Sequence, residues 1–163
     1  PFLFTGSIEE NIQFGNPAAT KDEIVLAAKT AGIHELISEM PNGYATHIQE
    51  RGSNLSMGHQ QLISIARAVV ANPRLLILDE ATANIDTKTE TLIQNSLKRL
   101  LSTRTSFVIA HRLSTIREAD RIIVFEDGEI SGLGTHNELL KNSKKYRDLH
   151  SMSYLSDPSN TLT

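Results

Sequence analysis

The sequence has no cysteine, few aromatic residues and no long apolar run. Without cysteine, the protein can form no disulfide bond, thiol nucleophile or cysteine-ligated metal site. The apolar runs are far shorter than the ~20 residues that a helix needs to cross a bilayer, so any membrane association has to come through other parts or partners. The net charge is −3 and the basic residues are scattered, which argues against a nucleic-acid partner.

A signal peptide and an initial methionine are also missing, since the chain opens with Pro1-Phe2-Leu3. We therefore expect the chain to be a piece of a longer protein. Its 163 residues, 39% of them apolar, are enough for one domain with a real core. We expect this domain to cover residues 1–150 and a flexible, Ser-rich tail to follow over 151–163.

Helices are predicted where apolar residues recur at helical spacing between polar end signals. The segment 57–71 is the strongest case, because four apolar residues share one face: Leu62, Ile65, Ala66 and Val69. The segment 87–101 presents a second apolar face: Ile93, Leu97, Leu100 and Leu101. Three Thr-x-x-Glu capping boxes mark helix starts: Thr20 with Glu23, Thr87 with Glu90, and Thr135 with Glu138.

Short, continuously apolar strands alternate with these helices in the middle of the chain, over 75–78, 105–111 and 121–127. Asp127-Gly128 then marks a tight turn into a further strand. This order predicts an α/β fold in which helices cover both faces of a parallel sheet. The first residues are mainly helical, so we expect a helical subdomain over about 6–56 beside a core over about 57–150.

Two adjacent acids, Asp79 and Glu80, end the apolar strand 75–78. Ligands of parallel sheets bind beyond the carboxyl ends of the strands, and His111 follows another strand in the same way. Hydrated Mg²⁺, bound through one or two carboxylates and substrate phosphates, would offset the cost of placing two carboxylates there. Taken alone, the acids are equally compatible with a strand that leads into a helix cap, and the histidine with a structural role.

The combination of motifs resembles the second half of an ATP-binding cassette (ABC) ATPase domain. "LLILDE" looks like its Walker B strand, "ANID" like its D-loop, and His111 like its switch histidine. "LSMGH" stands where the family signature Leu-Ser-Gly-Gly-Gln belongs, and "THIQERG" is similar to a segment of ABC exporters. The resemblance implies the second half of a RecA-like P-loop ATPase core, a parallel sheet with flanking helices, together with a helical subdomain.

The resemblance also implies a role for each residue. Glu80 and His111 would be catalytic, and Asp79 would hold Mg²⁺ through water. The signature residues Ser56, Met57, Gly58 and His59 would meet the ATP of an opposite subunit, and Asp86 would join that subunit through the D-loop. At the start of a helix, free N–H groups and the helix dipole suit a phosphate. Glu50 and Arg51 are either a solvated charge pair or, as the exporter resemblance favours, a contact with transmembrane coupling helices.

Some family features are absent or altered in this sequence. The phosphate-binding P-loop is missing, so we expect it to lie upstream of this chain, and we expect the isolated chain to be inactive. Met57 replaces a glycine of the signature and His59 a glutamine. Each ATP in this family lies between one subunit's Walker motifs and the other's signature, so these changes favour a heterodimer with a partner whose signature is intact. Drift tolerated in a homodimer is the alternative.

The leading functional hypothesis is therefore part of the nucleotide-binding domain of an ABC exporter. It would bind ATP and Mg²⁺ at the cytoplasmic face of the cell membrane and attach to transmembrane domains absent from this sequence. A soluble ABC ATPase of DNA repair or translation is the rival, but no long coiled-coil insertion or basic binding surface is visible. A third hypothesis is a binding or structural module without activity of its own.

Overall fold

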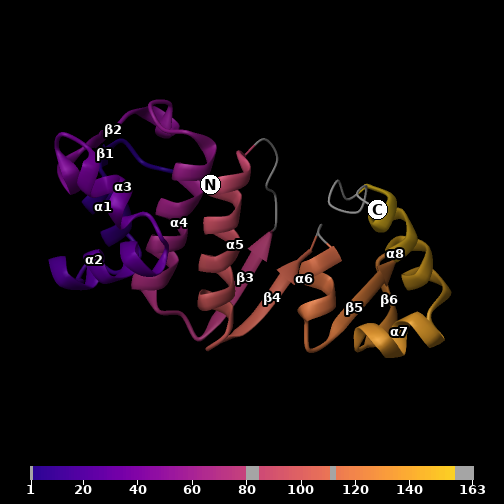
Figure 1. The fold of residues 1–163 in the computed structure, drawn as a ribbon. Helices are drawn as coiled ribbons and strands as arrows, with labels where there is room; N and C mark the ends of the chain where they lie inside the picture. The colour runs from indigo at the N-terminus through magenta and orange to yellow at the C-terminus, as the bar shows by residue number, and fades with distance from the viewer. Residues whose placement is uncertain (1, 80–84, 111–112, 157–163) are drawn as a thin grey trace. The chain divides into compact units, whose positions relative to one another are not determined.

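The computed structural model describes residues 2–79, 85–110 and 113–156, which form two compact units (Figure 1). The N-terminal unit comprises residues up to 76 together with 82–107. The C-terminal unit comprises 77–81 and the residues from 108 onward. Each unit has its own apolar core. No helix in the described ranges is long and apolar enough to span a membrane.

Helix α4 is the centre of the N-terminal unit, because α1, α2 and α5 all pack against it. Figure 1 shows α4 and α5 lying side by side. Leu62, Ile65 and Ala66 of the predicted apolar face are buried, and Ile63 is buried as well because α4 is covered on more than one side. The elements of this unit are β1 (Gly6–Ser7), α1 (Ile8–Gln13), α2 (Lys21–Thr30), α3 (His34–Glu39), the 3₁₀ helix η1 (Gly43–Ala45), β2 (His47–Ile48), the 3₁₀ helix η2 (Glu50–Gly52), α4 (Met57–Ala71) and α5 (Thr87–Leu101).

The helix ends agree with the sequence in two of the three predicted capping boxes. Helix α2 begins after Thr20 and helix α7 after Thr135, each with the predicted glutamate completing the box. The box predicted at Thr87 is wrong, because Asp86 caps α5 instead and makes Thr87 the first helical residue. A carboxylate one position earlier already accepts the free N–H of Thr89, so the threonine hydroxyl is not needed there.

Strands β3 (Leu75–Asp79) and β4 (Thr105–Ile109) pair with one another, and α5 connects them. Such a β-α-β connection is typical of a parallel pair, as predicted. The expectation that these strands are covered on both faces is wrong for the described residues: Leu75 is 51% exposed and Ile77 70% exposed, and of the run 75–78 only Leu76 is buried. Exposed and less exposed residues alternate along β3 and β4, so one face of the pair is covered and the other is exposed.

The C-terminal unit contains the predicted hairpin, in which β5 pairs antiparallel with β6. Asp127 and Gly128 both adopt positive φ, 49° and 84°, as the tight turn requires. Helix α8 continues to Ser156, so the chain stays helical beyond residue 151, where the sequence places the start of the tail. The elements of this unit are α6 (Leu113–Glu118), β5 (Ile122–Glu126), β6 (Glu129–Gly134), α7 (His136–Asn142) and α8 (Lys144–Ser156).

Arg67 of α4 holds the first residues of the chain to the N-terminal unit. Its guanidinium donates to the Asn11 carbonyl (2.8 Å), the Asn11 side-chain oxygen (2.9 Å) and the Phe2 carbonyl (2.9 Å). It also lies 5.1 Å from the ring centre of Phe4 and 5.5 Å from that of Phe14. Asn11 is almost fully buried, and its amide group also bonds to Phe4 and Ser7. Arg67 and Asn11 therefore form one connected polar joint.

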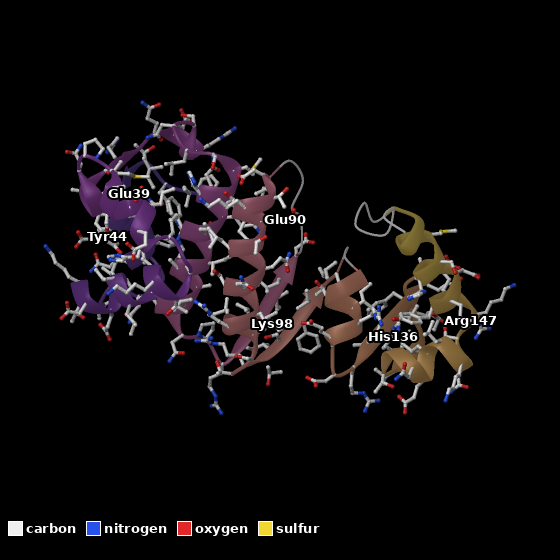
Figure 2. The ribbon with its side chains drawn as sticks, viewed as in Figure 1. Glu39, Tyr44, Glu90, Lys98, His136 and Arg147 are labelled. Carbon is white, nitrogen blue, oxygen red and sulfur yellow. The ribbon has the colours of Figure 1, made fainter. Side chains whose placement is uncertain are left out.

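His136 of α7, which Figure 2 labels, lies in a cluster with Tyr146 and His150 of α8. Its Nδ1 is 2.7 Å from the hydroxyl of the buried Tyr146, and its ring centre is 5.3 Å from that of His150. Burial, followed by the charges of His150 and Arg117, lowers the pKa of His136 below its ordinary value of 6.5. Burial likewise raises the pKa of Tyr146. The packing of α7 against α8 therefore favours a neutral His136.

Replacing Arg67 with methionine should lower the free energy of unfolding by about 2–4 kcal/mol, because it leaves the buried Asn11 short of a charged donor. The stability of Arg67→Lys should lie between that of the parent and that of Arg67→Met, because lysine keeps the charge but lacks the planar array of donors. Urea denaturation measures both. Arg147→Met is the control, because Arg147 also donates to two carbonyls but lies exposed on α8, and it should change stability by no more than about 0.5 kcal/mol.

Acidification should weaken the C-terminal unit through His136. A histidine whose pKa is lowered by folding binds more protons when unfolded, so its contribution is complete above about pH 6.5 and is lost as the pH falls toward the lower folded value. Thermal unfolding of the parent and of His136→Gln, compared between about pH 7.5 and 5.5, measures this. The glutamine variant should lose part of the pH dependence; an unchanged dependence would assign it to other groups.

Candidate nucleotide-contacting site

The signature segment, residues 56–59, begins helix α4. Ser56 caps the helix, and its Oγ accepts a hydrogen bond from the His59 N–H at 3.2 Å. Ser56 is exposed and Met57 is 51% exposed, so the helix start is open to solvent. The first N–H groups of a helix have no partner within the helix, and the positive end of its dipole lies with them. This end of α4 is therefore suited to an anion such as a phosphate.

Gly58 is required by packing in addition to any contact with a ligand. It is buried, and a Cβ placed on it would lie 2.3 Å from Thr89 Cγ2 and 3.2 Å from Ile85 Cγ2. The first contact is too short for any real side chain, so the glycine is what lets α4 and α5 approach. Sequence reasoning assigned Gly58 to phosphate approach and missed this packing role, which no local pattern reveals.

Asp86 caps α5 close to the signature segment. Its Oδ1 accepts from the Thr89 N–H at 3.0 Å, and Thr89 is the residue that Gly58 faces. The hydrogen bond from the Thr89 backbone holds the pKa of the Asp86 carboxyl below its usual value. The structure thus brings together the starts of α4 and α5, where Ser56, Gly58 and Asp86 were predicted to act.

Asp79, the predicted magnesium residue, is the last residue of β3 and is exposed. It belongs to the C-terminal unit, whereas the signature segment belongs to the N-terminal unit. The predicted catalytic residues Glu80 and His111 lie outside the described residues. Within the described ranges, no three His, Asp or Glu side chains gather as a metal-binding cluster.

Glu50 and Arg51, the predicted coupling residues, form the short helix η2 and are both exposed. Arg51 adopts a left-handed backbone, with φ 55° and ψ 19°. Strand β2, just before them, pairs antiparallel with β1, so that Gly6 faces Ile48. Because the pair is antiparallel, the residues before Gly6 and those after Ile48 leave it at the same end. The opening segment of the chain and η2 therefore extend from one end of a shared strand pair.

An exposed aromatic patch, formed by Phe2, Phe4 and Phe14, was not predicted from the sequence. Their exposed fractions are 59%, 38% and 61%, and the ring of Phe4 contacts the other two at centroid distances of 5.1 and 4.4 Å. Adjoining exposed apolar side chains mark interaction surfaces more often than isolated ones do. One signal was available: three of the five phenylalanines fall within the first 14 residues.

Gly58→Ala should destabilise the N-terminal unit by about 1–3 kcal/mol, because the added methyl group overpacks the contact with Thr89. Thr89→Ala removes the Cγ2 that obstructs it, so the double variant should recover part of the loss. Urea denaturation of the two single variants and the double variant measures the coupling. Strictly additive effects would place the conflict elsewhere.

Several known proteins resemble this chain in sequence and in fold. The family model described as "ABC transporter" matches residues 2–83. An uncharacterised ABC transporter ATP-binding protein of Bacillus subtilis, YfiC, is 52% identical over 153 residues, which cover 94% of this chain and 25% of that protein. A fatty acid ABC transporter ATP-binding/permease protein of Mycobacterium bovis is 51% identical over 145 residues, which cover 89% of this chain and 23% of that protein.

Among solved structures, a bacterial Atm1-family ABC exporter with ATP bound is similar with a TM-score of 0.82 and 40% identity. The similarity covers 93% of this chain and 26% of the exporter chain. The chain spans about a quarter of the length of the curated relatives it matches. On the family match and on the agreement of fold and sequence, the chain belongs to the ABC transporter family.

Proposed function

We propose that this chain is part of the ATP-hydrolysing nucleotide-binding domain of an ABC exporter. In it, binding and hydrolysis of ATP between two such domains would drive the movement of a substrate across a membrane. The observation that carries the proposal is the solvent-exposed start of α4 at Ser56 and Met57, which suits an anion, in a chain whose fold resembles an exporter with ATP bound.

The start of α4 would contact the triphosphate of the opposite subunit. Ser56 Oγ accepts the capping hydrogen bond from His59, which leaves its own proton for a phosphate oxygen. The N–H groups of Met57 and Gly58 lie in the first turn and suit the same phosphate. Asp86 accepts a hydrogen bond from the Thr89 N–H, and Thr89 packs on Gly58 of the signature segment. Asp86 would contact the opposite subunit across the interface.

Asp79 fits a magnesium ion that is held mainly by water and phosphate. Its exposed carboxylate is a hard oxygen ligand, and a site of this kind needs only one or two carboxylates from the protein. When bound, the ion would neutralise charge on the phosphates of ATP. Glu80 would orient the attacking water and accept its proton. His111 would donate to the γ-phosphate, and so respond to its presence.

The partners in this proposal are a second nucleotide-binding domain and transmembrane domains, which would hold the chain at the cytoplasmic face of the membrane. The opening segment with Phe2 and Phe4, and the exposed Glu50–Arg51 segment, leave one end of the β1–β2 pair and offer a surface for the transmembrane domains. Met57 and His59 favour a heterodimer whose partner carries an intact glycine-rich signature. Full activity of the protein expressed alone would instead favour a homodimer with a tolerated change.

The rival proposal, a soluble ABC ATPase, has less support. Two of the compared proteins are named as an exporter or a permease, and the described residues contain no long coiled-coil insertion. The third hypothesis, a module without activity of its own, applies to this chain in isolation. Its exposed strand residues, such as Ile77 and Phe107, suit burial against a further layer, and calorimetry should detect at most weak ATP binding.

Glu80→Gln in the full-length protein tests the proposal directly. The amide keeps the shape of the side chain but cannot accept a proton, so the rate of ATP hydrolysis should fall by about 10²–10⁴-fold while ATP binding persists. Phosphate release measures the rate, and retention of labelled ATP measures binding.

Glu39→Gln is the matched control, because Glu39 is an exposed glutamate at the end of α3. It should leave the rate of hydrolysis unchanged. Hydrolysis at the parent rate in Glu80→Gln would remove Glu80 from the mechanism.

A further inference from the structure

Gln60 of α4 fastens the loop that leads into the signature segment. Its side-chain nitrogen donates to the Gly52 carbonyl at 3.0 Å and to the Leu55 carbonyl at 3.1 Å. These carbonyls lie near the two ends of the loop between η2 and α4, and both protons of the amide nitrogen are used. One side chain of the first helical turns therefore fixes the whole approach to Ser56.

The loop has a backbone that needs such support. Arg51 and Gly52 both adopt positive φ, 55° and 75°, and for Arg51 that conformation is strained. Gly52 also makes room for Gln60, because a Cβ at Gly52 would lie 2.9 Å from the Gln60 amide carbon. The glycine and the glutamine are thus fitted to each other.

Asn54 secures the same loop on its other side. Its side chain donates to the His47 carbonyl at 3.0 Å and accepts from the Gln49 N–H at 3.0 Å, which ties the loop to β2. Asn54 holds the loop to the strand pair, and Gln60 holds it to α4. Leu55 directly precedes Ser56, so the Gln60 contact joins the end of the loop to the helix that carries the signature segment.

We propose that Gln60 is a positioning residue for ATP hydrolysis, which sets the place of the Ser56 hydroxyl and of the first N–H groups of α4 through the Gly52 and Leu55 carbonyls. The inference rests on the proposed function, because the phosphate is what those groups would meet. Phosphate contacts need placement within about 0.5 Å, and a displacement of about 1 Å costs up to about 100-fold in rate.

Gln60→Glu in the full-length protein tests this proposal, because the carboxylate keeps the shape and loses both donors. We expect kcat to fall by about 10-fold to 100-fold. The affinity for ATP of protein kept dilute and undimerised should stay within about twofold, because the signature contacts the ATP of the other subunit. Gln60→Lys restores a donor and should recover most of the rate.

Gln13→Glu is the matched control. Gln13 also donates a side-chain hydrogen bond to a loop carbonyl, that of Ala19 at 3.0 Å, within the same unit. The Gln13→Glu variant should lower thermal stability, as Gln60→Glu does, but should leave kcat unchanged. Equal kcat in Gln60→Glu and Gln13→Glu would overturn the proposal, since Gln60 would then be merely structural.

Hydrogen exchange of the full-length protein without nucleotide separates this inference from the proposed function. In Gln60→Glu the N–H groups of Leu55 and His59 should exchange at least about tenfold faster, and in Gln13→Glu they should not. If the parent protein hydrolysed no ATP, the proposed function would fail. Hydrogen exchange alone would then decide whether Gln60 holds the loop through the Gly52 and Leu55 carbonyls. Unchanged exchange at the Leu55 and His59 N–H groups would overturn the positioning role of Gln60, regardless of the ATPase activity measured.

Discussion

The N-terminal unit depends on the contact between Arg67 and Asn11. It joins residues 56 positions apart, and the bond to Phe2 spans 65 positions. Burial lowers the pKa of the Arg67 guanidinium, which is the cost of placing a cation there. Three carbonyl-type oxygens and two aromatic rings offset that cost. Arg67 lies about 15 Å along α4 from Met57, at 1.5 Å per residue, so α4 links the aromatic patch to the signature segment.

Local sequence rules predicted most of the helices and several of their ends. Thr20 with Glu23 and Thr135 with Glu138 were found because a capping box is complete within four residues. The same pattern at Ser7 and Glu10 was missed, because the six-residue α1 is too short to show apolar periodicity. At Thr87 the pattern misled, because Asp86 offered a better acceptor one residue earlier.

The candidate site was predictable as a set of residues and not as an arrangement. The motifs identified Ser56, Gly58, Asp79 and Asp86. They gave no indication that Thr89 excludes a side chain at position 58, or that Gln60 reaches back to the Gly52 carbonyl. Such contacts depend on how helices and loops pack, which a pattern along the chain does not encode. The roles of Glu80 and His111 rest on the family motifs alone.

The N-terminal unit is built from two separate stretches of the chain, residues up to 76 and residues 82–107. This constrains the order in which the unit can fold during synthesis on the ribosome. Residues up to 76 emerge first, yet the Ser96 hydroxyl lies 2.9 Å from the Ala31 carbonyl, and Gly58 packs on Thr89. The part of α4 that packs against α5 therefore stays uncovered until synthesis has passed residue 101, the end of α5. The β5–β6 hairpin needs no such delay, because its strands are joined by two residues. Within the N-terminal unit, the nascent chain is thus exposed to aggregation and chaperone binding between the synthesis of α4 and that of α5.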